Sequence, residues 1–564
     1  MQPDVQDADP AAASIVRGIP LDEEEGLGSL TIAGYAREMT ARFASREAVA
    51  FREPGGVVRW SYADVWQRSL EVARALVAAG VEKDTRVGIL LSNRPEYIPL
   101  VFGIALAGGV SVPLNTFSTR PELEYLLRTS AVSLLVFERR VASTDFAAML
   151  LELAPELERE TAGPLRSAGF PYLRRAVMLD DGGPRPAAVG SYDALLRGGD
   201  TVADDLIAAR QAATTAADLG VLFFSSGSTG LPKGMLHAHR AIALQWYRWP
   251  RLLKLGEDVR CWTANGFFWS ANFSLQIGCA FTSGGTAVLQ STFDAKQALE
   301  LFESEHVTFP VFSPHQQARM AAAPNFRQVD LSSLRCLDDR SPLNEHPTVS
   351  TSWRQPCAYG TTETLTACTA FPASEPSEGR EGYGLPLAGN IVKIVDPATG
   401  IPVSRGERGE ILVKGPTLML GYLGKTLDET FDDDGFYHTG DGGYVDAQGW
   451  LYFEGRLNDI IKTGGANVSP VEIDTVIRRY PGVKIAQTIG VPHETLGEMV
   501  VSCVVAQDGA ALEEDPLRQY LRGQLASYKV PRRILFLDEQ QVEMTGSDKV
   551  KAGRLRELVG TQLG

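Results

Sequence analysis

Cysteine is scarce in this chain: there are six in 564 residues, and no two of them form a Cys-x-x-Cys pair. They stand far apart in the sequence, as Cys261, Cys279, Cys336, Cys357, Cys368 and Cys503. This scatter excludes the disulfide framework of a small secreted protein and the ligand spacing of a zinc site. We therefore expect reduced thiols and a cytoplasmic protein.

An excess of positive charge and long apolar runs are also missing. The formal net charge of −15 argues against a general nucleic-acid binder and gives no attraction to anionic membranes. The acidic, Ala/Asp/Pro-rich N-terminus lacks the basic start and apolar core of a signal peptide. The longest apolar stretch, Tyr97 to Leu114, is interrupted by Pro99 and Pro113, which indicates a buried helix leading into a strand. Neither nucleic acid nor a membrane is expected as a partner.

The first part of the chain alternates between strand-like and helical patterns, which is typical of parallel βαβ units. The expected strands and helices are Arg86–Leu91, Glu96–Ala107, Val110–Leu114, a helix from Pro121, and Leu134–Phe137. The alternation resumes with a helix over His237–Trp249, a strand at Ala287–Leu289, a helix over Ala295–Ser304 and a strand at Val307–Val311. We interpret His237 and His239 as packing or capping residues on that first helix. The piece from 180 to 215 is rich in Asp, Glu, Pro and Gly and is expected to be a surface connection.

The later part of the chain changes character. Short β segments such as Glu410–Val413 and the hairpin-like Gly443–Phe453 appear beyond about residue 385. From about residue 457, strands and amphipathic helices mix. The sequence therefore predicts an α/β protein with a loosely ordered tail at 1–27 and a large N-terminal domain at 28–455. That domain comprises βαβ subdomains and a small β-rich subdomain, and a small, mobile C-terminal α+β domain follows at 456–564.

The densest chemical signal is the segment Ser225–Gly234, which follows the apolar run Val221–Phe224 and reads Ser-Ser-Gly-Ser-Thr-Gly-Leu-Pro-Lys-Gly. An apolar run that ends in a Gly-rich turn predicts a strand feeding a loop. Backbone N–H groups, hydroxyls and one lysine are the donors that a polyphosphate needs. The segment is not a Walker A loop. A flexible Ser/Gly linker is the less favoured alternative, because linkers seldom follow a buried strand.

Five further motifs follow in order: Tyr359-Gly360-Thr361-Thr362-Glu363, Tyr437-His438-Thr439-Gly440-Asp441, Gly455-Arg456-Leu457-Asn458-Asp459 with Lys462, Thr463 to Glu472, and Thr545-Gly546-Ser547-Asp548-Lys549-Val550. With the loop, this series resembles the adenylate-forming superfamily, which contains acyl-CoA synthetases, luciferases and peptide-synthetase adenylation domains. The resemblance spans residues 225 to 551. Each motif alone has a plainer interpretation: Tyr359–Glu363 as a helix N-cap, Asp441 as a turn residue, and Lys549 as a solvated surface charge.

The resemblance implies a role for each motif. The phosphate-binding residues would be Ser226, Gly227, Ser228, Thr229, Gly230 and Lys233. The adenylate-binding residues would be Asp339, Arg340, Ser341, Tyr359, Gly360, Thr361, Thr362, Asp441 and Arg456. Glu363 would help hold Mg²⁺, a hard cation that prefers carboxylate and phosphate oxygens. The catalytic groups would be Thr229, Glu363, Lys462 and Lys549, and the ammonium of Lys549 would bridge the substrate carboxylate and the α-phosphate.

The resemblance also implies a C-terminal domain that rotates between two half-reactions. Its hinge would be Asn458, where the family usually has Asp or Lys, and Asn tolerates the unusual backbone angles that rotation requires. Gly464 and Gly465 would line the channel for CoA, because paired glycines allow the backbone to approach a slender thiol arm. Trp269 and Asn272 would belong to the acyl pocket.

Three departures from the family pattern fall on groups that serve adenylate formation. Asp339 and Arg340 replace two glycines beside the adenine, where charged side chains should reshape the pocket. Trp269 stands where a histidine is common. Asp548 precedes Lys549 and could partly neutralise it. The segment around Gly464 and Gly465 looks intact.

The favoured function is therefore an acyl-CoA ligase that uses ATP, CoA and a small-molecule carboxylic acid. Trp246, Trp249, Trp262 and Trp269 suggest a bulky apolar acid, although tryptophans can equally be core. The departures suggest a narrower alternative, in which the protein forms only the thioester from an acyl adenylate that a separate ligase supplies. An enzyme that loads a carrier protein and a non-catalytic nucleotide-binding relative remain alternatives, and a homo-oligomer stays compatible with the sequence.

Overall fold

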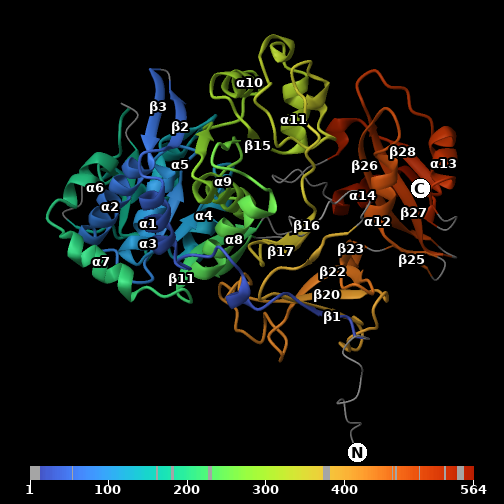
Figure 1. Cartoon of the computed structure of the whole chain (residues 1–564), viewed down its shortest axis with the longest axis horizontal. Helices are drawn as coiled ribbons and strands as arrows, with labels where there is room; N and C mark the ends of the chain where they lie inside the picture. Colours follow the sequence, from blue (N-terminus) through green and yellow to red (C-terminus); the bar gives the residue numbers. More distant parts are fainter. Residues whose placement is uncertain are drawn as a thin grey trace, which may run out of the picture.

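The computed structural model describes residues 13–53, 55–159, 163–179, 183–225, 232–371, 382–459, 461–463, 466–493, 496–525, 529–542 and 552–563. Figure 1 shows the N-terminal helices and strands at one end of the long axis and the C-terminal domain at the other. A β-rich subdomain lies between them along the lower edge of this view, where β1, β20 and β22 are labelled. A large α/β part followed by a small α+β domain confirms the predicted fold class.

The first βαβ subdomain is an eight-stranded sheet. Its strand order is β10 (Gly190–Ser191), β9 (Arg175–Leu179), β6 (Leu134–Glu138), β4 (Arg86–Leu90), β5 (Val110–Pro113), β11 (Leu219–Ser225), β12 (Lys233–Ala238) and β21 (Gly421–Tyr422). The strands from β10 to β11 pair in parallel, whereas β12 and β21 are antiparallel additions. The accompanying helices are α2 (Tyr62–Ala78), α3 (Tyr97–Ala107), α4 (Arg120–Ser130), α5 (Phe146–Leu153), α6 (Tyr192–Gly198) and α7 (Asp204–Ala213).

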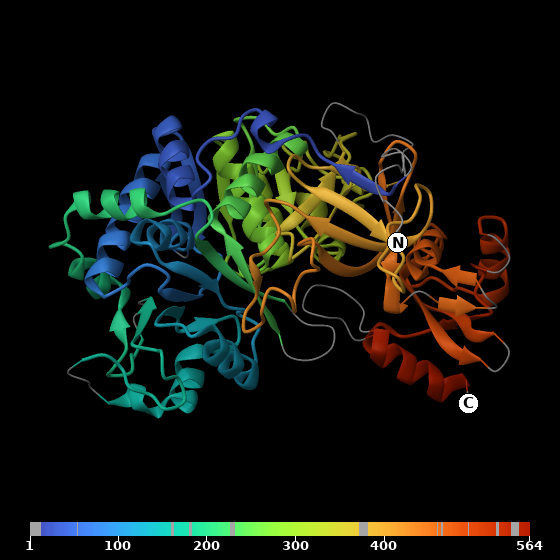
Figure 2. The ribbon, with the colours of Figure 1, turned by 90° about the horizontal axis from the view of Figure 1, so that it is seen from below.

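The second subdomain is a five-stranded sheet in the order β15 (Phe309–Val311), β13 (Arg260–Thr263), β14 (Thr286–Leu289), β2 (Glu47–Glu53) and β3 (Gly56–Ser61). Its helices are α8 (His239–Leu252), α9 (Ser270–Ser283), α10 (Ala295–Ser304) and α11 (Pro314–Ala321). One apolar cluster joins the two sheets through α1 (Ile32–Arg42), α2, α3, α8 and α9. Every residue of α3 is buried, as its unbroken apolar sequence predicts. The layered arrangement is seen from below in Figure 2.

The β-rich subdomain is built on a five-stranded sheet in the order β1 (Ile15–Arg17), β19 (Ile391–Val395), β20 (Gly409–Lys414), β22 (Tyr437–Val445) and β23 (Leu451–Arg456). A smaller sheet beside it contains β16 (Ala358–Thr361), β17 (Thr366–Ala370) and β18 (Leu385–Pro386). Strands β22 and β23 form the hairpin that the sequence predicted near Gly443–Phe453.

The C-terminal domain begins with a single turn of 3₁₀ helix, η5 (Leu457–Asp459). Its sheet runs in the order β25 (Ala466–Val468), β24 (Ile461–Thr463), β27 (Gly497–Ala506) and β26 (Val483–His493), and β28 (Arg533–Phe536) pairs with β27. The helices beside it include α12 (Pro470–Ile477), α13 (Glu514–Arg522) and α14 (Ala552–Leu563).

Residues 13–25 form an N-terminal strap, and the prediction of a loosely ordered tail is wrong for them. Strand β1 pairs antiparallel with β19. Farther along the strap, the Glu24 carboxylate accepts hydrogen bonds from the guanidinium of Arg248 on α8, the shortest at 2.7 Å. The composition of this segment does not predict that it is ordered, because the partners of the strap lie more than two hundred residues away in the chain.

Two smaller predictions are also wrong. The described residues between 183 and 215 are not a simple surface connection, since they contain β10, α6 and α7. His237 lies on β12, and the helix begins only at His239. Trp246 and Trp262 are both fully buried in separate apolar clusters, so packing accounts for these two tryptophans.

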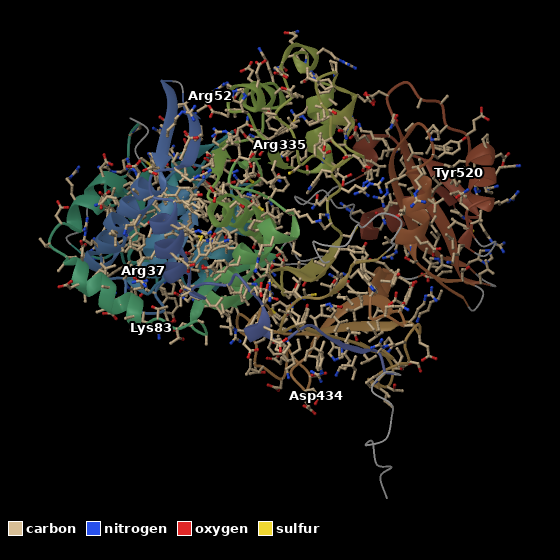
Figure 3. All side chains as sticks on the ribbon, viewed as in Figure 1. Arg37, Arg52, Lys83, Arg335, Asp434 and Tyr520 are labelled. Carbon is tan, nitrogen blue, oxygen red and sulfur yellow. The ribbon has the colours of Figure 1, made fainter. Side chains whose placement is uncertain are left out.

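Figure 3 shows the side chains over the whole molecule, and many of the charged ones form ion pairs. Arg335 pairs with Asp258 at 2.6 Å, and Lys83 pairs with Asp218 at 3.0 Å. Exposed pairs of this kind contribute little to stability. Across the described ranges, no helix combines the length and the apolar character that a membrane span needs.

Candidate active site

The ends of the Gly-rich loop are fixed by strand pairing. Ser225 at the end of β11 pairs with Lys233 at the start of β12, so the two ends of the segment lie opposite each other. The hydroxyl of Tyr125 on α4 donates a hydrogen bond to the carbonyl of Pro232 at 3.1 Å. The predicted phosphate-binding residues Ser226, Gly227, Ser228, Thr229 and Gly230 lie outside the described residues.

The segment Tyr359–Glu363 forms the end of β16 and a tight turn into β17. Gly360 is required here, because a Cβ on it would lie 1.6 Å from the carbonyl oxygen of Thr366. Leu365 and Thr366 have left-handed φ angles of +47° and +80°, which non-glycine residues rarely adopt. The hydroxyl of Thr364 accepts a hydrogen bond from the backbone N–H of Thr361 at 2.9 Å and bonds to the carbonyl of Thr366 at 2.7 Å. The turn is therefore held in a strained but well-bonded shape.

Two side chains of helix α8 hold this turn by hydrogen bonds. The side-chain amide of Gln245 donates to the carbonyl of Ala367 at 2.7 Å, and the indole N–H of Trp249 donates to Oγ1 of Thr366 at 3.1 Å. Because α8 directly follows β12, the element after the Gly-rich loop also positions the Thr-Glu turn. Neither residue belongs to a motif, so this supporting role could not be predicted from the sequence.

Glu363 lies beside two tyrosines that the sequence did not connect with it. The Tyr422 hydroxyl donates to Oε1 of Glu363 at 2.7 Å, and the hydroxyls of Tyr422 and Tyr437 are 2.8 Å apart. Burial tends to raise the pKa of Glu363, but the hydrogen bonds, first that from Tyr422, outweigh it and lower the pKa overall. Nζ of Lys233 lies 5.5 Å from the centre of the Tyr422 ring. Lys233 and Glu363 therefore both interact with Tyr422.

His237 is a buried titratable group that interacts with the charge of Glu363. Burial lowers the pKa of His237 to about 4, even though the negative charge of Glu363 opposes the shift. His239 is also buried, its pKa is lowered to about 4 for the same reason, and its Nδ1 accepts a hydrogen bond from the backbone N–H of Ile32 at 3.3 Å. Both imidazoles are neutral at pH 7 and act in packing.

A second cluster joins Tyr359, Asp441 and Arg456. The Tyr359 hydroxyl donates to Oδ2 of Asp441 at 2.6 Å, and Nε of Arg456 lies 3.0 Å from Oδ1 of the same carboxylate. Asp441 and Arg456 are opposite each other in the β22–β23 ladder, which fixes this pair. Tyr359 and Asp441 are 5% and 3% exposed. The Tyr359 ring also packs 5.6 Å from the ring of Phe453, so the protein covers part of its surface.

The two charged residues that replace the glycines, Asp339 and Arg340, each form an ion pair with a neighbouring side chain. Nε of Arg340 lies 2.7 Å from Oδ1 of Asp338, and Nε of Arg354 lies 2.7 Å from Oδ2 of Asp339. Burial tends to raise the pKa of Asp338, but hydrogen bonds from Arg340 lower it overall. The hydroxyl of Ser341 caps the 3₁₀ turn Pro342–Glu345. The sequence alone did not show that each carboxylate has its own guanidinium.

The two predicted acyl-pocket residues differ in their surroundings. Trp269 is half-buried at the start of α9 and its ring lies 5.1 Å from that of Phe268, which in turn contacts the exposed ring of Phe117 at 5.8 Å. Asn272 is 3% exposed and its amide is used internally. It bonds to the hydroxyl of Thr263 at 2.8 Å and to the carbonyl of Asn265 at 2.7 Å. The amide of Asn272 thus braces the loop that leads to Trp269.

After Arg456, the structure describes two more of the predicted residues. Asn458 lies in η5, between β23 and β24. Lys462 lies on β24, with an exposed side chain and a backbone N–H that donates to Glu498 at 2.7 Å. Gly464, Gly465 and Lys549 lie outside the described residues.

The chain belongs to the AMP-binding enzyme family: residues 36–423 match the family model, and residues 472–549 match the model of the AMP-binding enzyme C-terminal domain. It is an acid–thiol ligase of the acyl-CoA synthetase type within the adenylate-forming superfamily, as the sequence resemblance predicted.

Individual relatives agree with this class. The feruloyl-CoA synthase of Amycolatopsis sp is 32% identical, with 92% of this chain and 97% of that protein aligned. The medium-chain acyl-CoA ligase ACSF2 of Danio rerio is 29% identical, with 95% and 90% aligned. ATP-bound MatB from Rhodopseudomonas palustris superposes with a TM-score of 0.73 at 25% identity, covering 93% of this chain and 98% of MatB.

Proposed function

We propose that this protein forms an acyl-CoA thioester from ATP, CoA and a bulky apolar carboxylic acid, in two steps through an acyl adenylate. The observation that carries the proposal is a continuous line of contacts. Lys233 lies over Tyr422, which bonds to Glu363 and to Tyr437, and Tyr437 shares β22 with Asp441. These contacts and the shared strand connect the groups proposed for the phosphates with the group proposed for the ribose.

Each group has a task in this proposal. Lys233 and the loop hydroxyls neutralise and orient the polyphosphate. Asp441 accepts hydrogen bonds from the ribose, while Tyr359 and Arg456 hold its carboxylate in place. Lys549, with Thr229 and Lys462, stabilises the charge that develops as the carboxylate attacks the α-phosphate. Rotation at Asn458 then brings Gly464 and Gly465 to the site and admits the thiol of CoA.

The residues at Glu363 fit a magnesium ion. Glu363 has a lowered pKa and is ionised, and the buried hydroxyl of Thr361 lies beside its carboxylate. Within the described part of the chain, no group of three or more His, Cys, Asp or Glu side chains could hold a metal. Mg²⁺ commonly takes one carboxylate and completes its shell with phosphate oxygens and water. When bound, the ion would neutralise charge on the phosphates, and Glu363 and Thr361 would hold it.

The paired charges at 338–340 and 354 favour the complete reaction over thioester formation alone. A free carboxylate at Asp339 would repel the triphosphate, whereas a carboxylate paired with Arg354 repels it much less. The same holds for Asp338 beside Arg340. The replacement of two glycines therefore leaves no uncompensated negative charge among these side chains.

The apolar acid is inferred from aromatic side chains and from the relatives. Phe117, Phe268 and Trp269 form a contiguous aromatic group at the start of α9. A feruloyl group and a medium-chain acyl group, named for the two relatives above, are both largely apolar. An aromatic wall would favour such acids over small polar ones.

The test measures pyrophosphate release and acyl-CoA formation with ATP, Mg²⁺, CoA and a panel of ferulate, octanoate and malonate. Acyl-CoA yield from a synthetic feruloyl adenylate is measured in parallel. We expect both products with ferulate or octanoate, little with malonate, and at least a tenfold loss with Lys233→Ala. Lys83→Ala serves as the control, because Lys83 is a surface lysine paired with Asp218.

Each outcome decides between the alternatives. Thioester from the synthetic adenylate without pyrophosphate release from ATP would replace the two-step proposal with the thioester half-reaction supplied by a separate ligase. Acyl-CoA formation with malonate and with no other acid would overturn the proposal that the substrate is an apolar acid. Silence with every acid and with the adenylate would favour a nucleotide-binding protein without ligase activity.

A further inference from the structure

Two ion pairs flank the short 3₁₀ turn η5, one on each side. Before the turn, Arg456 pairs with Asp441 at 3.0 Å. At its end, Oδ1 of Asp459 lies 2.9 Å from Nη2 of Arg556. Only Leu457 and Asn458 stand between the two tied residues.

The two pairs belong to different bodies. Arg456 is the last residue of β23, and its guanidinium also donates to the carbonyl of Thr439, so it is fixed to the β-rich sheet. Arg556 lies on α14 of the C-terminal domain. That helix packs against β26 and β27 through Leu555 and Val559, which are 3% and 0% exposed. The turn therefore joins a residue anchored in the N-terminal domain to one anchored in the C-terminal domain.

We propose that Asp459 and Arg556 are positioning residues that confine the hinge to Leu457 and Asn458, so that the C-terminal domain turns as one body. Both members of the pair follow the hinge, and rotation about residues 457 and 458 carries them together. Without the pair, the chain after Asn458 can also bend at Asp459, and the orientation of the domain becomes less defined.

The consequence for catalysis rests on the proposed function. Helix α14 begins three residues after Lys549, so a domain that turns as one body delivers Lys549 in a defined orientation. ATP binds to groups of the N-terminal domain in that proposal. Loss of the pair should thus lower kcat and leave the KM for ATP nearly unchanged. An exposed ion pair corresponds to at most about a fivefold change, which sets the expected size.

The experiment compares Asp459→Asn, Arg556→Gln, their double variant and the charge swap Asp459→Arg with Arg556→Asp. Lys484→Ala is the matched control, since Lys484 pairs with Glu539 at 2.7 Å in the same domain but away from the turn. Hydrogen exchange of the amides at 457–463 reports hinge freedom without any activity, and steady-state kinetics with ATP give kcat and KM. Lys233→Ala is included to test the proposed function separately.

We expect about threefold to fivefold faster exchange and a similar fall in kcat in each single variant. The double variant should be no worse than the singles, and the charge swap should recover most of the loss. Unchanged amide exchange rates in the single variants would overturn the proposal that the ion pair confines the hinge. Faster exchange with unchanged kcat would overturn the positioning role, provided that Lys233→Ala is impaired. If Lys233→Ala keeps full activity, the proposed function fails. The exchange rates of the Asp459 and Arg556 variants then still show whether the ion pair confines the hinge.

Discussion

The most consequential single contact of the N-terminal strap is the ion pair between Glu24 and Arg248, and we predict that Glu24→Gln strongly destabilises the protein. Arg248 is 2% exposed and Glu24 is 15% exposed at their side chains. Nε of Arg248 donates to both carboxylate oxygens at 3.2 and 3.1 Å, and Nη2 donates to one of them at 2.7 Å. Glutamine keeps the shape but turns one acceptor into a donor and leaves the guanidinium charge uncompensated.

The size of the effect follows from burial. Removing one partner of a buried ion pair costs about 3–5 kcal/mol, because the other charge stays in a low-dielectric environment. Arg248 keeps one acceptor, the carbonyl of Ala388 at 2.7 Å, and Glu24 is partly accessible, so the lower end applies. We therefore expect a loss of about 3 kcal/mol in the free energy of unfolding.

Urea unfolding followed by tryptophan fluorescence is a suitable assay, because Trp246 and Trp249 lie on the same helix as Arg248. The control is Asp204→Asn, whose partner Arg74 is at 2.6 Å but whose own side chain is 64% exposed. That change should cost less than about 1 kcal/mol. A Glu24→Gln variant as stable as Asp204→Asn would refute the reasoning. Replacing both partners, as Glu24→Leu with Arg248→Met, should restore much of the loss.

Two further predictions concern other parts of the chain. Burial raises the pKa of Asp474 on α12 to about 7. Between about pH 4 and pH 7 the Asp474 carboxyl is therefore ionised in the unfolded chain and protonated in the folded one. As the pH rises through this range, the C-terminal domain loses about 4 kcal/mol of stability. Asp474→Asn should remove this dependence, and thermal melts of both proteins at pH 5 and pH 8 check it; parallel pH profiles would contradict it. Gly360→Ala should reduce acyl-CoA formation at least tenfold, because its Cβ would displace Thr366 and the turn that carries Glu363. Gly198→Ala, where a Cβ meets nothing within 4 Å, should leave kcat unchanged, and equal activities of the two variants would contradict the steric argument.

The parts of the fold that could be predicted are those with a local signal. The helix Ala295–Ser304 and the strand at Val110 follow from periodicity and from short apolar runs, and both lie where the pattern placed them. His237 was assigned to a helix because the apolar pattern of β12 continues into α8. Pairing of β12 with β11 decides that boundary, and such pairing is invisible to a local pattern.

In the candidate site, too, residues with a local signal could be predicted and residues placed by long-range pairing could not. Glu363 and Asp441 stand in short motifs and could be named from the sequence. Tyr422, which donates to Glu363, stands fifty-nine residues farther along, and no motif includes it. Its position depends on the pairing of β21 with β12 at the edge of the eight-stranded sheet. The pairing of Arg354 with Asp339 is likewise a product of loop geometry.

The pairing of β1 with β19 has a consequence for protein synthesis. Ile15 is opposite Lys393, so β1 waits during synthesis for a partner made about 380 residues later. At ~5–20 residues per second, that delay is about 20–80 s. Strand β2 can pair early with β3, but its other edge waits for β14, since Val49 is opposite Ala287. For most of its synthesis the nascent chain thus carries open strand edges near its N-terminal end, and β1 finds its partner only when the β-rich subdomain has emerged.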